Sequence, residues 1–155
     1  MATLKQKASA AIIAASLAIA GPFIARQEGK KNQAYQDAIG VPTICYGHTD
    51  KVRMGQTKTN EECQKLLETD LLESSKIVEE YVTAPLTVYQ RAALISFVFN
   101  VGPNNFIKST LLRKLNAGDY DGAANEFLRW DYADGQKLPG LTKRRAAERN
   151  IFLTE

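Results

Sequence analysis

The stretch QEGKKNQAYQDAIGVPTICYGHTD, residues 27–50, decides both the fold and the candidate chemistry of this chain. Glu28 is followed nine residues later by Asp37 and then by Thr43, and His48 is the only histidine in the chain. The segment is rich in Tyr, Ile, Val and Thr with glycine and proline between them, which is typical of short strands joined by turns. It therefore predicts a small antiparallel sheet within residues 34–50.

Helical signals replace the strand pattern after this sheet. The sequences TNEE at 59–62 and TVYQ at 87–90 are capping boxes, so each predicts the start of a helix. The first helix must end before Pro85. The second, which contains RAALISFVFNV, is apolar nearly all round, which predicts a buried central helix ending at Gly102 and Pro103. Shorter helices are expected at 110–117, 120–130 and 141–152.

These elements predict an α+β fold that is mostly helical and divided into two lobes. A small sheet lobe and a larger helical lobe would be joined by the long helix that begins near residue 60. A cleft between two lobes is a place where a polymer substrate can lie.

The composition limits the classes of function. The 155 residues suffice for one domain, and 45% hydrophobic and 24% charged residues are ordinary for a globular protein. The net charge of +3 is mild, and no zinc-finger spacing, phosphate loop or dense basic patch with aromatic residues is present, so a nucleic-acid partner is not expected. One histidine and two separated cysteines are too few for a metal site, so none is expected.

The first 25 residues differ in composition from the rest of the chain. After Lys5 and Lys7, an uncharged run of 18 residues extends from Ala8 to Ala25. As a helix this run would be about 27 Å long, which is barely the thickness of a bilayer core. Alanine and serine dominate the run, so its hydrophobicity is weak. A helix held only loosely in a membrane fits both features.

Three other interpretations of this segment compete with a transient membrane anchor. A cleavable signal peptide fits the basic start, the short apolar region and the small-residue pattern at 18–20. A permanent anchor fits the length but not the weak hydrophobicity. An amphipathic helix fits poorly, because no polar face exists between Lys7 and Arg26.

The acidic residues of the opening stretch suit glycosidic bond cleavage. That reaction needs one carboxyl group to protonate the leaving oxygen and a second to attack the sugar or activate a water. Glu28 and Asp37 could face each other across a cleft, with Thr43 holding a water beside Asp37. Each residue alone could equally be ordinary surface or strand composition, and the spacing by itself is weak evidence.

The surrounding motifs strengthen the catalytic interpretation. The chain from about residue 26 to residue 155 resembles the phage-type lysozymes, the endolysins of tailed bacteriophages (glycoside hydrolase family 24). The motifs that carry the resemblance are EG at 28–29, AYQD at 34–37, GVPTICYGHT at 40–49, TNEECQKLLETD at 59–70, ALISFVFNVG at 93–102, STLLRKLNAGDYDGAANEFLRW at 109–130 and GLTKRRAAER at 140–149. The family pattern of Glu, eight residues, Asp, five residues and Thr is matched in full.

The resemblance implies a peptidoglycan hydrolase that cleaves the β-1,4 bond between N-acetylmuramic acid and N-acetylglucosamine. Glu28 would be the general acid, and Asp37 would activate a water with Thr43 as second partner. Such an inverting mechanism predicts carboxyl groups roughly 6.5–9.5 Å apart. The resemblance implies no cofactor, no metal and a monomeric enzyme whose partners include peptidoglycan glycan strands.

The resemblance also suggests supporting residues. His48 is expected to pair with Asp70 and so to tie the sheet lobe to the long helix. One arginine of the basic run at 143–149, assigned to Arg145, is expected near Glu28, although a solvated helix face is the simpler explanation of that run. Trp130 is expected in the core rather than as a sugar platform.

A subset of these endolysins carries an uncleaved, weakly hydrophobic signal-anchor-release segment, and residues 8–25 resemble one. The expected division is residues 1–25 as this segment and 26–155 as the catalytic domain. The expected partners are then the host secretion machinery and the host inner membrane. The enzyme would be held inactive at the periplasmic face, because Glu28 lies three residues past Ala25, and would enter the periplasm after release.

The cysteines bear on how release would activate the enzyme. No cysteine precedes Cys45, so an inhibitory disulfide to the anchor is not available, and the released segment is expected to refold onto the body. Cys45 and Cys63 are then free to bond each other in an oxidising periplasm, which would contribute about 3 kcal/mol. The alternative is a pair of buried, reduced thiols.

Two other functions remain open from the sequence. A lytic transglycosylase needs the glutamate but not a water-holding Asp37 and Thr43. A membrane-tethered peptidoglycan-binding domain without catalysis would not need Glu28, Asp37 and Thr43 together.

Overall fold

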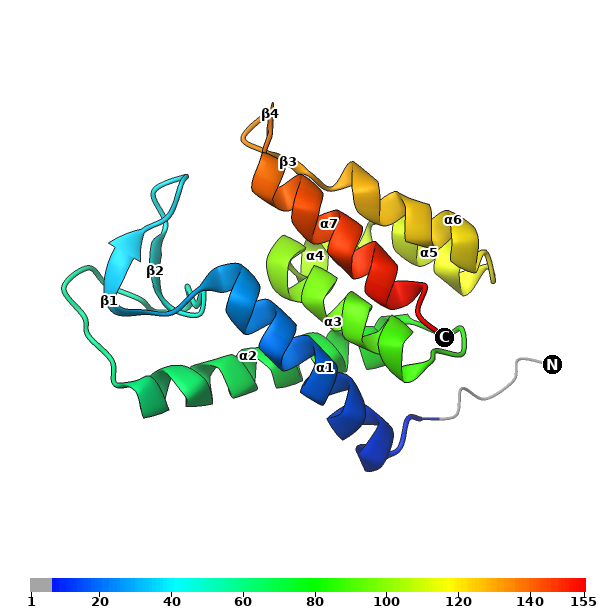
Figure 1. Cartoon of the computed structure of the whole chain (residues 1–155), viewed down its shortest axis with the longest axis horizontal. Helices are drawn as coiled ribbons and strands as arrows, with labels where there is room; N and C mark the ends of the chain where they lie inside the picture. Colours follow the sequence, from blue (N-terminus) through cyan, green and yellow to red (C-terminus); the bar gives the residue numbers. More distant parts are fainter. Residues whose placement is uncertain (1–6) are drawn as a thin grey trace.

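The computed structural model describes residues 7–155, which form a small sheet lobe and a larger helical lobe connected by helix α2 (Figure 1). The predicted fold class is confirmed. Lys5 of the N-terminal segment lies outside the described residues. The elements in chain order are α1 (Ala10–Glu28), β1 (Lys31–Gln36), β2 (Pro42–Cys45), α2 (Asn60–Tyr81), α3 (Val88–Val101), α4 (Pro103–Ile107), α5 (Thr110–Asn116), α6 (Tyr120–Glu126), the 3-10 turn η1 (Phe127–Arg129), β3 (Tyr132–Ala133), β4 (Gln136–Lys137) and α7 (Pro139–Phe152).

The sheet of the small lobe is an antiparallel pair, β1 with β2. Tyr35 lies opposite Thr43 and Gln36 opposite Pro42, and the register shifts between Lys31 and Tyr35. The connection between the strands is therefore a tight turn that begins at Asp37. This arrangement brings Asp37 and Thr43 close in space although six residues separate them along the chain.

Both predicted capping boxes are present. The Thr59 hydroxyl accepts from the Glu62 amide at the start of α2, and the Thr87 hydroxyl accepts from the Gln90 amide at the start of α3. In each case the side chain of the later residue reaches back to the backbone of the threonine, so free amide groups of the first turn are satisfied at both ends of the motif.

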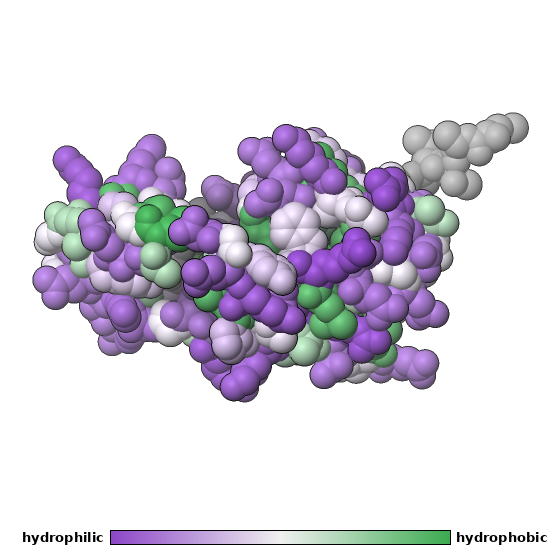
Figure 2. Space-filling view, turned by 90° about the horizontal axis from the view of Figure 1, so that it is seen from above, coloured by the Kyte–Doolittle hydropathy of each residue, from purple (hydrophilic) through white to green (hydrophobic). Residues whose placement is uncertain are grey.

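Helix α3 is the centre of the core, as predicted, with every residue from 91 to 98 buried. The Phe97 ring packs edge-on against Phe106, Phe127 and Trp130, with centroids 5.2–6.2 Å apart. Edge-to-face packing is the favoured geometry of aromatic pairs. Trp130 is partly buried against this cluster, in line with a core position. Figure 2 shows the surface of one face of the molecule, which is mostly hydrophilic with separate hydrophobic areas.

Helix α1 packs against α2 and α3. Ser9 caps its first turn, Pro22 lies within it, and it continues without a break to Glu28. Only four of its residues are buried: Ser16, Ala20, Phe23 and Ile24. The helix therefore crosses the expected boundary between residues 25 and 26, and that division of the chain stays a prediction.

The structure adds elements that the sequence did not predict. Gly102 ends α3, but Pro103 immediately begins the short helix α4, because proline is well tolerated in the first turn of a helix. A two-residue hairpin, β3 with β4, precedes α7. Helix α7 itself begins at Pro139, two residues earlier than expected.

Candidate active site

A cleft of about 790 Å³ lies between the two lobes. The helical lobe contributes residues of α2 and α3 to its walls, and the sheet lobe contributes β1, β2 and the turn that follows. Glu28, Asp37 and Thr43, which the sequence selected as catalytic candidates, all line this cleft, and so do His48 and Asp70.

Glu28 is the last residue of α1, where Gly29 ends the helix with a φ of +65°. Its Oε1 accepts a hydrogen bond of 2.7 Å from Nη1 of Arg144, on α7. The Arg144 side chain is only 5% exposed and that of Glu28 19%. The carboxylate is therefore fixed from behind by a buried cation and still open to the cleft.

Gly47 lies directly against the Glu28 carboxylate. Its φ is +72°, and a Cβ atom on it would lie 2.5 Å from Oε2 of Glu28. Real Cβ contacts are essentially never this short, so only glycine fits beside the carboxylate in its present position. The positive φ independently favours glycine.

Asp37 is held by the turn that it begins. Its Oδ1 accepts from the backbone amides of Ile39 at 3.0 Å and Val41 at 2.8 Å. Its own amide donates to the carbonyl of Val41 at 3.0 Å. Carboxylates often fold tight turns in this way. These bonds use only Oδ1, so they leave Oδ2 for other contacts.

Thr43 is almost completely buried, with 3% of its surface exposed. Its hydroxyl donates to the carbonyl of Val41 at 2.9 Å. The oxygen then keeps its acceptor capacity for a water in the cleft.

Tyr35 is a site residue that sequence reasoning left without a role. It lines the cleft, and the pKa of its phenol is raised, chiefly by burial and then by the negative charges of Glu28 and Asp37. The negative charges of Glu28 and Asp37 therefore both act on the Tyr35 hydroxyl. The sequence signal for it was its place in the AYQD motif, two residues before Asp37.

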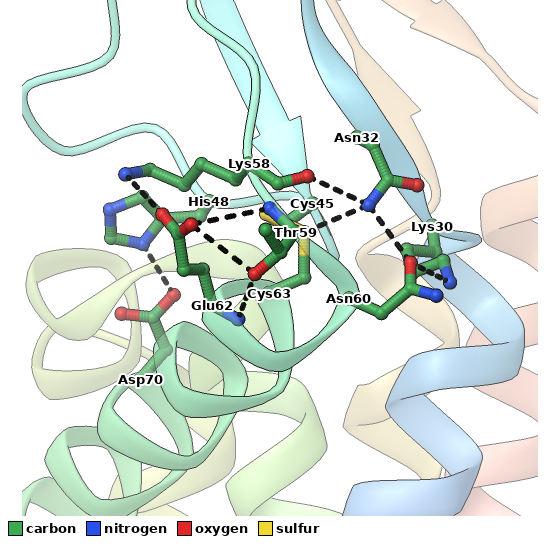
Figure 3. The surroundings of a disulfide bond; sticks show 10 residues. All are labelled: Lys30, Asn32, Cys45, His48, Lys58, Thr59, Asn60, Glu62, Cys63 and Asp70. Carbon is green, nitrogen blue, oxygen red and sulfur yellow. Dashed lines mark hydrogen bonds and ion pairs between the residues drawn. A yellow bond between two sulfur atoms is a disulfide. The ribbon is translucent and has the colours of Figure 1, made fainter.

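His48 and Asp70 connect the lobes. Nδ1 of His48 lies 2.7 Å from Oδ2 of Asp70, and Nε2 lies 3.1 Å from the carbonyl oxygen of Asp50. The ring thus bridges the turn after β2 and the middle of α2 (Figure 3). This geometry suits a structural tie more than a catalytic base.

The arginine that contacts Glu28 directly is Arg144, one residue before the Arg145 that the resemblance suggested. Successive residues of a helix point about 100° apart, so a one-residue error selects a different face. Arg145 instead points into the core, fully buried, where it stacks over the Phe97 ring at 5.2 Å and binds Glu148 and Asn100.

Cys45 and Cys63 form a disulfide with an S–S distance of 2.05 Å. Both residues are fully buried, and Asn32, Asn60 and the capping box of α2 surround the bond (Figure 3). The bridge joins the end of β2 to the first turn of α2. It therefore holds the strand that carries Thr43 against the helix that connects the lobes.

The phage lysozyme family model matches residues 25–148. The chain belongs to the phage lysozyme family. It is therefore a glycoside hydrolase of the lysozyme class, and the cleft between its lobes is the candidate active site.

Individual relatives cover nearly the whole chain. A SAR-endolysin of Bacteriophage PS119 is 41% identical over 97% of this chain and 94% of its own length. A SAR-endolysin of Enterobacteria phage P21 is 40% identical over 97% and 96%. Among solved structures, the muramidase domain of SpmX from Asticaccaulis excentricus is 37% identical, with a TM-score of 0.79 over 97% of this chain and 99% of that domain.

Proposed function

We propose that this chain is a phage endolysin, an N-acetylmuramidase that hydrolyses the β-1,4 bond between N-acetylmuramic acid and N-acetylglucosamine in bacterial peptidoglycan. The family and the names of its relatives support the substrate class. The observation that carries the proposal is the placement of Glu28, Asp37 and Thr43 in one cleft between two lobes.

The mechanism we assign is inverting hydrolysis with two carboxyl groups. Glu28, at the end of α1, protonates the leaving glycosidic oxygen. Asp37 takes a proton from a water that attacks the opposite face of the sugar, and the Thr43 oxygen accepts a hydrogen bond from that water. The turn amides hold Oδ1 of Asp37, so Oδ2 is the oxygen that meets the water.

Glu28→Gln tests the acid, because it removes the proton donor and keeps the shape. We expect the rate of hydrolysis of purified murein sacculi to fall by at least about a hundredfold, the lower range of general acid catalysis. Asp121→Asn, an exposed carboxylate on α6 outside the cleft, is the control and should keep wild-type activity. Activity of Glu28→Gln near the wild-type level would remove the acid assignment.

The products separate hydrolysis from the alternatives. An inverting muramidase yields a free reducing end with the α configuration, which proton NMR detects early in the reaction. A lytic transglycosylase yields a 1,6-anhydro end instead and would tolerate Asp37→Asn. A binding domain without catalysis would yield no new ends from murein at all.

We also propose that residues 8–25 tether the enzyme to the periplasmic face of the host inner membrane after export by the secretion machinery, and that release into the periplasm activates it. Within the described residues, α1 is long and apolar enough to cross a membrane by length and composition. The same helix ends at Glu28. Membrane insertion of α1 would therefore remove the candidate acid from the cleft.

Fractionation of an expressing Gram-negative host tests the tether. Intact mass should show the full-length chain in the membrane fraction, moving to the soluble periplasmic fraction when the membrane is de-energised. A species shortened to begin near Gly21 would instead indicate an ordinary signal peptide, and the muramidase assignment would survive that result.

The docking of α1 on the body has its own test. Ile24→Ala removes a fully buried side chain one turn before Glu28, and should cost about 2–5 kcal/mol and lower activity. Ile12→Ala on the same helix removes a side chain that is 40% exposed, so its effect should stay within about 0.5 kcal/mol. Equal activity of the two variants would contradict a positioning role for α1.

A further inference from the structure

Three buried charged side chains, Arg144, Glu148 and Arg145, form a continuous chain behind the candidate acid Glu28. Glu28 accepts from Arg144 at 2.7 Å, and Nε of Arg144 lies 3.6 Å from Oε2 of Glu148. Oε1 of Glu148 in turn binds Nη1 of Arg145. Arg145 and Glu148 are completely buried, and Arg144 is 4% exposed. Arg144 is therefore shared between a carboxylate in the cleft and one in the core.

Helix α3 completes the surroundings of Glu148. The Ser96 hydroxyl donates to its Oε2 at 2.5 Å, and Arg145 also donates to the side-chain oxygen of Asn100, which lines the cleft. The cluster thus joins α1, α3 and α7. Arg144, Arg145 and Glu148 all lie in the GLTKRRAAER motif at 140–149.

The two buried positive charges of this cluster are best compensated when Glu148 is ionised. Guanidinium groups stay protonated in proteins, so Arg144 and Arg145 contribute two positive charges. Burial raises the pKa of Glu148, while Arg145, Arg144 and the Ser96 hydroxyl oppose that rise. A neutral Glu148 would leave Arg145 without its paired carboxylate and Arg144 paired only with Glu28, which is unfavourable in a poorly solvated site.

We propose that Glu148 is a positioning residue for catalysis, which shares Arg144 with Glu28 and so allows the acid to hold its proton. This inference rests on the role of Glu28 in the proposed function. A general acid must carry a proton before it can donate one, and an unshared Arg144 would favour the ionised carboxylate. The Glu148 carboxylate offsets part of the positive charge of Arg144 from the side of the core.

Other titratable and charged groups near Glu28 also contribute to the electrostatic potential at its carboxyl group. Tyr35 and Asp37 face it from β1 and the following turn, and the rest of the cleft wall carries three further acids, one histidine and one lysine. These further groups are His48, Asp50, Asp70, Glu73 and Lys76. The variants below leave all of them in place.

Two single substitutions should shift the activity profile in opposite directions. Glu148→Gln removes a negative charge, so the alkaline limb of the pH–activity profile should move to lower pH. Arg145→Gln removes a positive charge, so the same limb should move to higher pH. We expect about one pH unit each, the size for charges about 10 Å apart at an effective dielectric constant of about 20.

A purely structural role predicts a different pattern, because lost packing would lower the maximal rate of both variants without opposite shifts. The double variant R145Q/E148Q removes one charge of each sign, so the net charge of the cluster is unchanged, and the alkaline limb should return to within about 0.3 pH units of wild type. Glu126→Gln is the matched control, since Glu126 is also buried and paired with Lys114 but lies outside the cleft. The alkaline limb of the pH–activity profile of this variant should stay at the wild-type position.

A second measurement tests the coupling if the core variants do not fold. Linkage is reciprocal, so Glu28→Gln should lower the titration midpoint of Glu148, read from its carboxyl carbon by NMR, by about the same amount. Glu28 lies at the cleft surface, and its replacement leaves the core intact. An unmoved midpoint, or shifts of the same sign in both single variants, would overturn the inference.

The two proposals fail separately. If Glu28→Gln keeps full activity, the acid assignment fails whatever the NMR titration shows. If Glu28→Gln is inactive and the limbs of the Glu148 and Arg145 variants do not move, only the role of Glu148 fails.

Discussion

Replacing Gly47 by alanine would place a methyl group where the Glu28 carboxylate now lies. The added Cβ would be 2.5 Å from Oε2, 2.9 Å from Cδ and 3.3 Å from Cγ of Glu28. An ordinary contact needs at least 3.4 Å, so the carboxylate must move by about 1 Å. It would move against its 2.7 Å bond to Arg144, which holds the opposite oxygen.

The substitution has two separable effects. A misplacement of about 1 Å at a reacting group can lower the rate about a hundredfold, which is the loss of kcat/KM that we expect. The positive φ of +72° adds backbone strain of about 1–2 kcal/mol for any residue with a Cβ. In a domain of this size each kcal/mol lowers Tm by about 2–4 °C.

Gly118→Ala is the matched control, because its φ is +83° and no atom lies within 4 Å of its added Cβ. It should show a similar loss of stability with normal activity. Turbidity loss of purified murein sacculi gives kcat/KM, and circular dichroism on heating gives Tm. If Gly47→Ala stays within about threefold of Gly118→Ala in activity, the contact with Glu28 does not position the acid.

Two further predictions concern the disulfide and the cleft phenol. The double variant C45S/C63S should lose about 3 kcal/mol in the free energy of unfolding, measured by urea denaturation, and a loss below about 1 kcal/mol would contradict a stabilising bridge. Ultraviolet titration of the Tyr35 phenol should give a lower pKa in Glu28→Gln than in wild type, because a neighbouring negative charge is removed, and an unchanged pKa would place the two groups too far apart to interact. The raised pKa in the folded state also means that the unfolded chain loses this proton first, so Tyr35 should reduce stability as pH rises above about 10, where unperturbed tyrosine titrates.

Local signals in the sequence predicted the helices well. The capping boxes at Thr59 and Thr87 act within four residues, so their hydrogen bonds do not depend on the rest of the fold. The continuous apolar sequence around Phe97 left no face for solvent, so α3 had to be central. Positions that depend on local chemistry could therefore be read directly from the sequence.

The remaining parts of the site depend on contacts between distant elements. The choice between Arg144 and Arg145 required the phase of α7, which its start at Pro139 sets. The Glu148 cluster required α3 to lie beside α7, and the sequence carries no sign of that neighbour. The contact of Gly47 with Glu28 required the turn after β2 to fold back on the end of α1. None of these can be read from a window of one helix or strand.

The continuity of α1 into Glu28 has a practical consequence for anyone who wishes to prepare the enzyme in soluble form. Deleting the apolar residues would also delete the four side chains through which α1 packs on the body, and would leave Glu28 beside a new chain end. Solubility is better sought by polar substitutions at the outward positions of the same helix, such as Ile12, Ala15 and Ala18, which are exposed. In this protein, the apolar segment cannot be removed without also removing the helix that ends at Glu28.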